Sequence, residues 1–282
     1  MEDSNQDAGT HNPFPRHLVS LGKRIAPLLA IMLARGPLAR VVRSLEAYLA
    51  FIQGKGSGTG WDLDAEVRVA ASRLRRANAV IFDVGAHCGE WSARLLRSLG
   101  STIECRLFLF EPLPSCQNIL RSRNLPGTIL IGAAVGDRNG CVTLFSPDDH
   151  SPVASVYPRR DSYLQGYAFV QHQVRIVTID QIVADLGIDL VDFVKLDIEG
   201  NEVAALRGAT KCLASNRIRA LSFEFGSPNI NSRTYFHDLW DILHSFGYQI
   251  KRIAPGGILV PIERYYEDLE YFRGVTNYLA EI

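Results

Sequence analysis

The stretch Val80–Ser92, VIFDVGAHCGEWS, decides the fold of this chain. Its first half belongs to a short apolar run, Ala79–Val84, which is typical of a strand that is buried on both faces. Its second half contains Gly85 and Gly89, and a helical pattern begins at Glu90. A strand, a glycine turn and a helix in this order predict the first unit of an open α/β sheet.

Strands and helices alternate along the chain after this unit. We expect further strands at 107–110, 129–133, 191–196 and 218–225, and helices at 90–99, 114–123, 201–214 and 234–246. This alternation predicts a doubly wound, mostly parallel sheet. The tail from residue 248 is mostly strand. Strands without helical crossovers pair antiparallel, so we expect an antiparallel edge there.

The turn after the first strand indicates a bound ligand. A glycine at position 85 lets a ligand approach the backbone, and the next helix offers free N–H groups to a polar or negative group. The GxGxxG spacing of nicotinamide-binding turns is absent, and Asp83 stands directly before the turn. A carboxylate there would repel a pyrophosphate and attract the ammonium and sulfonium charges of S-adenosylmethionine. The rival interpretation is an NAD-dependent oxidoreductase on a similar sheet.

Glu111 is a second candidate for ligand binding. It follows the strand at 107–110 and precedes Pro112. An acidic side chain at the carboxyl end of such a strand can accept both hydroxyls of a ribose. A surface glutamate before a proline is the alternative, and the nearby glycine turn favours the ribose role.

The segment 192–202, DFVKLDIEGNE, holds the candidate catalytic residues. Strand alternation places Lys195 and Asp197 on one face, with Glu199 just past the strand end. A lysine in a buried strand needs a partner or a function, so Lys195 and Asp197 form either a structural or a catalytic pair. Proton removal from an acceptor is expected of Asp197, Glu199, Glu224 or His87.

Six segments, taken in order, resemble the FkbM family of methyltransferases. They are VIFDVGAHCGEWS (80–92), FLFEP (108–112), GAAVGDRNGCVTLF (132–145), VTIDQIV (177–183), VDFVKLDIEGNEVAALRGA (191–209) and LSFEF (221–225). The resemblance covers roughly residues 78–282. It implies a Rossmann-like class I methyltransferase fold, S-adenosylmethionine as cofactor and O-methylation of a sugar, glycan or natural product. The alternative to an enzyme is a protein that keeps this fold and binds the cofactor but catalyses no reaction.

The resemblance also implies the site. The acceptor and the transferred methyl group would face Asp197 and Glu199, with Lys195 beside them. The expected cofactor contacts are Asp83, Val84, Gly85, Ala86, His87 and Gly89 at the methionine end, Glu111 and Pro112 at the ribose, Ala134 and Asp137 near the adenine, and Asp197. The pair His87-Cys88 departs from the family pattern, in which small or amide residues are usual.

Net charge and cysteine usage limit the binding partners and the cellular setting that we expect. Lys plus Arg and Asp plus Glu both total 30, so the zero net charge offers no overall attraction for nucleic acid. We expect a small-molecule or glycan acceptor instead. The five cysteines lack CxxC spacing, which argues against a zinc site or a disulfide framework and for a reducing, cytoplasmic setting. No metal is expected.

The N-terminal region lies outside the resemblance. We expect disorder in residues 1–16, a helical extension with a glycine-rich linker in 17–60, and the methyltransferase domain in 61–282. An apolar stripe marks one helix face: Leu38, Val42, Leu45, Leu49 and Ile52. Seven basic residues between Arg16 and Lys55 face one acidic residue, Glu46. The helix is either a cap with a solvated basic face or a peripheral contact to the inner membrane face.

Overall fold

A computed structural model describes residues 26–282, apart from residues 28, 36, 59–61 and 101–103. The expected disorder of residues 1–16 lies outside the described residues. The chain divides into two compact units, Met1–Leu49 and Ala50–Ile282. Both sheets belong to the larger unit.

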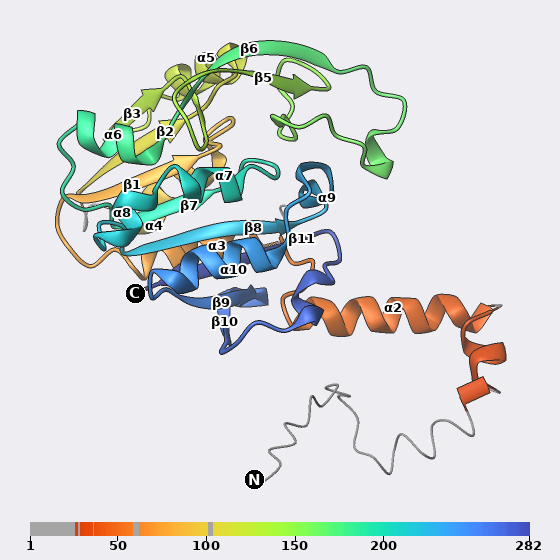
Figure 1. The fold of residues 1–282 in the computed structure, drawn as a ribbon. Helices are drawn as coiled ribbons and strands as arrows, with labels where there is room; N and C mark the ends of the chain where they lie inside the picture. The colour runs from red at the N-terminus through yellow and green to blue at the C-terminus, as the bar shows by residue number, and fades with distance from the viewer. Residues whose placement is uncertain (1–25, 28, 36, 59–61, 101–103) are drawn as a thin grey trace, which may run out of the picture. The chain divides into compact units, whose positions relative to one another are not determined.

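An eight-stranded sheet forms the centre of the larger unit (Figure 1), in the order β10-β9-β11-β8-β7-β1-β2-β3. All neighbours from β3 to β8 pair parallel, whereas β11, β9 and β10 add antiparallel pairs at one edge. The predicted doubly wound sheet with an antiparallel edge is confirmed. Its strands are β1 (Ala79–Val84), β2 (Cys105–Phe110), β3 (Thr128–Ile131), β7 (Phe193–Leu196), β8 (Ala220–Gly226), β9 (Gln249–Ala254), β10 (Ile258–Ile262) and β11 (Val275–Glu281).

Helices cover both faces of this sheet. Alternate residues of a strand point to opposite faces, so a strand buried on both faces contributes side chains to two cores. In β1, Phe82 packs in a core with residues of α7 and α10, whereas Ile81 packs in a second core with residues of α3 and α4. The helices of the larger unit are α3 (Leu63–Ala71), α4 (Glu90–Leu99), α5 (Pro114–Arg123), α6 (Ile179–Asp185), α7 (Glu202–Arg207), α8 (Thr210–Ala214), α9 (Pro228–Ser232) and α10 (Phe236–Ser245). Helix α2 (Pro37–Ile52) precedes them.

The strand order changes direction at β1. The chain places β2 and β3 on one side of β1 and then crosses to β7 on the other side. The carboxyl ends of β1, β2 and β7 therefore lie together at the switch point, where open α/β sheets bind their ligands.

A second, three-stranded sheet has the order β4-β6-β5. It consists of β4 (Ala134–Val135), β5 (Gly140–Ser146) and β6 (Val170–Val177). Strands β5 and β6 pair antiparallel. The chain between these two strands, residues 147–169, is called the insert below.

The glycine-rich stretch at 54–58 packs against β9 and β11. The hydroxyl of Ser57, which is buried, donates to the carbonyl oxygens of Gly54 at 2.7 Å and Ile253 at 3.1 Å. The backbone N–H of Gly58 donates to the carbonyl oxygen of Val275 at 2.8 Å. The stretch interpreted as a linker thus contributes packing to the larger unit. The division of the chain at residue 60 stays a prediction.

Among the described residues, no helix is both long enough and apolar enough to cross a membrane.

Replacement of Gly56 by alanine tests whether this packing stabilises the larger unit. Gly56 has φ +74°, and a Cβ atom there would lie 1.9 Å from the carbonyl oxygen of Arg273. Gly247 has φ +83° but no heavy atom within 4 Å of such a Cβ. Both alanine variants carry a backbone cost of about 1–2 kcal/mol, and we expect Gly56→Ala to lose about 1–3 kcal/mol more from the clash. Urea unfolding followed by circular dichroism measures the difference, and equal losses would contradict the packing role.

Candidate active site

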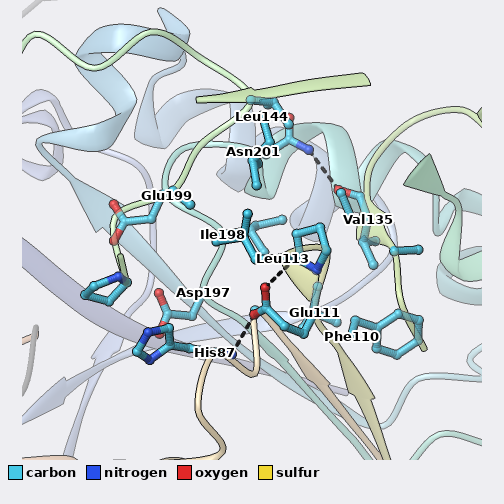
Figure 2. A pocket seen from close by; sticks show the side chains of 18 of the residues that line it. His87, Phe110, Glu111, Leu113, Val135, Leu144, Asp197, Ile198, Glu199 and Asn201 are labelled. Atoms are coloured by element: carbon cyan, nitrogen blue, oxygen red, sulfur yellow. Dashed lines mark hydrogen bonds between the residues drawn. The ribbon is translucent and has the colours of Figure 1, made fainter. Parts of the chain in front are cut away.

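A pocket lies at the carboxyl ends of β1, β2 and β7 (Figure 2). Its empty space, including open solvent at the mouth, is about 560 Å³. Its wall comes from the turn after β1, the loop after β2, strands β4 and β5, the insert and the loop after β7. The predicted residues that line it are Val84, Gly85, His87, Glu111, Pro112, Ala134, Asp197 and Glu199. The structure thus brings together the three sequence segments from which the site was expected.

The turn after β1 packs directly against the end of β7. Gly85 has φ +85°, and a Cβ atom there would lie 1.8 Å from the carbonyl oxygen of Asp197. Its N–H donates to the carbonyl oxygen of Phe110 at 3.1 Å. Only glycine permits this approach, so the floor of the pocket is backbone from three neighbouring strands.

Glu111 lies at the centre of the pocket. Its carboxylate accepts the backbone N–H groups of His87 and Leu113, each at 2.8 Å. The side chain is buried, and burial raises its pKa to about 7 against the opposing effect of these two donors. Each carboxylate oxygen has a second acceptor position. The residue therefore combines a fixed orientation with room to accept two hydroxyl groups.

The walls on either side of Glu111 differ in character. In Figure 2, Glu111 lies between Phe110 and Val135 on one side and His87 and Asp197 on the other. S-adenosylmethionine has a flat base, a ribose and a charged amino-acid end in the same order. The apolar wall, the central carboxylate and the glycine turn that a Cβ would fill therefore suit this cofactor.

Five predicted residues do not line the pocket: Asp83, Ala86, Gly89, Asp137 and Lys195. The expected contact of Asp83 with the cofactor stays a prediction, although Asp83 does not line the pocket. Its carboxylate is fully buried and accepts the hydroxyl of Ser92 at 2.5 Å. Asp137 is exposed and pairs with Arg138 at 3.2 Å, away from the pocket wall. Gly89 faces Leu120 of α5, and Ala86 packs in the core.

Lys195 forms an ion pair beneath the pocket. Its ammonium donates to Asp197 at 2.8 Å and lies 3.8 Å from a carboxylate oxygen of Asp83. Burial alone would lower the pKa of Lys195, but the two carboxylates outweigh burial and raise it. A lysine that stays charged cannot accept a proton. The geometry therefore makes Lys195 a residue that orients Asp197.

Glu199 is held by a buried arginine from the insert. The guanidinium of Arg159 donates to Glu199, to Asp161 at 2.6 Å and to the hydroxyl of Tyr163 at 2.7 Å. No part of the Arg159 side chain is exposed. Burial raises the pKa of Glu199 to about 7, although the charge of Arg159 opposes this shift. Glu199 also has φ +54°, an uncommon backbone conformation that is concentrated at functional sites.

The sequence analysis missed Arg159 and Asn201. Arg159 lies 40 residues before Glu199 in a polar stretch without a periodic pattern. Asn201 lines the pocket, and its amide donates to the carbonyl oxygen of Val135 at 2.8 Å, which ties β4 to the start of α7. Its place in the run EGNE was the available signal, because that run follows a strand end.

The insert forms part of the pocket wall through Ser151, Pro152, Ala154 and Val156. The ring of His87 contacts the carbonyl oxygen of His150 at 2.7 Å. His172 lies 3.7 Å from Asp149.

The remaining candidate base, Glu224, does not line the pocket. It lies in β8 opposite Asn277 of β11. Burial raises its pKa well above the usual value, and the charges of Asp197 and Glu199 add to this shift. Of the four candidate bases, the described pocket includes Asp197, Glu199 and His87.

One group of potential metal ligands stands out among the described residues. The ligand atoms of His87, Cys88 and Cys116 lie within 4.8 Å of one another. Cys116 is fully buried in an apolar cluster, and burial raises the pKa of its thiol to about 12. A protonated thiol is a poor metal ligand. The expectation that the site contains no metal stays a prediction.

The pH dependence of stability tests the burial of Glu202, which begins α7 beside this site. Its side chain is 1% exposed, and burial raises its pKa to about 8. The folded chain therefore holds a proton that the unfolded chain releases near the ordinary glutamate pKa of 4.5. This contribution is lost as the pH rises from about 4.5 to 8, with a slope of at most about 1.4 kcal/mol per pH unit. Glu202→Gln should leave stability near pH 5 similar and make its decline toward pH 8 less steep.

Chemical unfolding at several pH values measures this slope, with Glu104→Gln before β2 as an exposed control. Glu111 and Glu199 also have a pKa of about 7, so some decline remains in the variant. An unchanged slope in Glu202→Gln would contradict the prediction.

Comparison with solved structures finds neighbours of low identity. A methyltransferase FkbM from Methylobacillus flagellatus KT is 18% identical, with a TM-score of 0.46, and the match covers 86% of this chain and 60% of that one. A precorrin-6y C5,15-methyltransferase from Geobacter metallireducens GS-15 is 13% identical, with a TM-score of 0.38, 77% of this chain covered and 88% of that one. The plantazolicin methyltransferase BpumL in complex with SAH is 9% identical, with a TM-score of 0.39, 94% covered here and 99% there. TM-scores this low carry no argument of their own.

The family comparison is decisive. No curated protein matches the chain. The family model described as methyltransferase FkbM domain matches residues 83–250, more than half of the chain. This range begins in β1 and includes every residue of the pocket wall. The cofactor of such a domain is S-adenosylmethionine. The chain belongs to the FkbM methyltransferase family.

Proposed function

We propose that the chain transfers a methyl group from S-adenosylmethionine to a hydroxyl oxygen of a sugar, glycan or natural product. The observation that carries this proposal is Glu199, a carboxylate with a pKa of about 7 that lines the cofactor pocket and is oriented by Arg159. A hydroxyl is a poor nucleophile and gains from a base that takes its proton. A group that titrates near neutral pH can do this and release the proton afterwards.

The proposed roles of the other residues follow from their places in the pocket. When bound, S-adenosylmethionine supplies an activated methyl group for in-line displacement, which depends chiefly on alignment. Glu111 accepts the hydroxyls of the ribose. The Gly85 turn leaves room for the amino-acid end, and Asp197 lies beside it. Lys195 keeps Asp197 in place through its 2.8 Å contact.

The surroundings of Glu199 support a hydroxyl-rich acceptor. Arg159, Asp161 and Tyr163 form a polar network on the insert beside it. The backbone N–H of Arg160 donates to Asn231 at 2.9 Å, and the amide of Asn231 donates to Asp161 at 3.1 Å. Such a surface offers donors and acceptors at several positions, which suits a polyhydroxylated molecule.

One prediction of this proposal concerns the cofactor. Glu111→Gln should weaken the binding of S-adenosylhomocysteine about 10- to 100-fold, because the ribose hydroxyls lose a charged acceptor. Isothermal titration calorimetry measures the affinity, and a thermal melt checks that the variant folds. Glu90→Gln, on the exposed side of α4, is the matched control. Binding of NAD without binding of S-adenosylhomocysteine would overturn the cofactor assignment.

A second prediction of this proposal concerns the base. In Glu199→Gln the shape is kept and the base is removed, so single-turnover methylation should slow about 100- to 10,000-fold with cofactor affinity nearly unchanged. In the unmodified chain the rate should rise as the pH increases through about 7, because Glu199 then loses its proton. Arg159→Gln should also slow transfer, since Glu199 loses its orientation. Arg160→Gln, next in the chain and exposed, should not.

The acceptor for these assays comes from labelling. Incubation with methyl-labelled S-adenosylmethionine and fractionated extracts of the source organism identifies a labelled product, and mass spectrometry with NMR locates the methyl group. A methyl ether supports O-methyl transfer. A label on nitrogen or carbon would refute it, and equal single-turnover rates for Glu199→Gln and the unmodified chain would remove Glu199 as base. The absence of any labelled product would favour a binding module without turnover.

A further inference from the structure

Helix α2 exposes an apolar face along its whole length. The large apolar side chains of this face are between 38% and 63% exposed. The residues of this face, called the α2 apolar face below, are Leu38, Val41, Val42, Leu45, Tyr48, Leu49 and Ile52. Their spacings of three and four residues place them on one side of the helix. Exposed apolar surface of this extent marks an interaction site.

The opposite side of α2 carries basic residues and a small one. A rotation of about 100° per residue places Arg40, Arg43 and Ala47 away from the α2 apolar face. Both arginines are exposed. Glu46 is the single acidic residue of the helix. The helix therefore separates apolar from positively charged side chains, which is the pattern of a helix that lies in a membrane interface.

The residues before α2 extend the same character. Residues 29–33 are helical, and Leu29, Ile31 and Met32 among them are exposed by 43%, 69% and 58%. Arg35 stands between this helical segment and α2 and is exposed. Residues 29–35 therefore add exposed apolar side chains and one positive charge to those of α2.

We propose that α2 binds the surface of an anionic lipid bilayer, with its α2 apolar face in the acyl boundary and its arginines toward the lipid headgroups. With 16 residues the helix is only about 24 Å long, and it carries charges, so it lies in the interface rather than crossing it. The anionic headgroups are the charge complement of Arg35, Arg40 and Arg43.

A second copy of the chain fits the α2 apolar face less well. Helices that pair along such a face carry charges of both signs at the positions beside it. Ser44 and Ala50 lie beside the α2 apolar face and carry no charge. Glu46 is the charged residue at its border. The excess of positive charge therefore favours the lipid surface as the partner. This inference goes beyond the proposed function and is independent of it.

Vesicle flotation of the full chain tests the proposal. The probes are vesicles of phosphatidylcholine alone and vesicles that also contain phosphatidylglycerol. We expect the chain to float with the anionic vesicles, and raised salt should weaken this binding. Leu45→Glu combined with Leu49→Glu should reduce the bound fraction about tenfold or more, because charged groups would enter the acyl boundary. Ile258→Glu, at a 66% exposed position of β10, is the control that should leave binding unchanged.

A second variant, Arg40→Gln combined with Arg43→Gln, tests whether the positive charges contribute to binding. This variant should lose binding to the anionic vesicles, with melting temperatures that show an intact fold. Failure of the chain to float, or equal flotation of the Leu45/Leu49 variant, would overturn the proposal. Light scattering supplies the last outcome. A dimer that the Leu45/Leu49 variant separates, without vesicle binding by the full chain, would assign the face to a second copy and refute the lipid partner.

Discussion

The backbone of the turn after β1 lies against the backbone at the end of β7, and the pocket depends on this contact. A Cβ atom at Gly85 would lie 1.8 Å from the carbonyl oxygen of Asp197. Because no side chain separates the two segments, Glu111, from the loop after β2, lines one pocket with Asp197 and Glu199, from the loop after β7. The switch in strand order at β1 leaves this place uncovered by a crossover helix.

Burial of carboxyl groups around this contact serves function at the expense of stability. Glu111 and Glu199 have a pKa of about 7, and Glu202 has one of about 8, because each is taken out of water. Partners hold each of them in place: two backbone N–H groups for Glu111, Arg159 for Glu199 and two backbone N–H groups for Glu202. Oriented carboxylates that are ready to accept hydrogen bonds are what a ribose and an acceptor hydroxyl require. They are also groups that a chain selected only for stability would replace.

The insert links the acceptor side of the pocket to the same network. Arg159 reaches Glu199 from a segment that has little regular structure, and the insert also supplies four residues of the pocket wall. In the proposed function, the insert contributes to the acceptor side of the pocket, while the cofactor side is formed at strand ends. Sites on loops that a rigid sheet positions follow the same division.

The sheet, the glycine turn and the strand-end positions of Glu111, Asp197 and Glu199 could be predicted from the sequence, because they are local and follow from strand and helix periodicity. The family was expected from the resemblance of six segments, and the match to the family model shows it. Contacts between residues far apart in the sequence became visible only in the folded chain. The tertiary structure turned Asp83 toward Ser92, joined Arg159 to Glu199 across 40 residues, and packed Gly54–Gly58 against β9 and β11. Local pattern is blind to such contacts, because the direction of a side chain and its partner are set by the packing of whole elements.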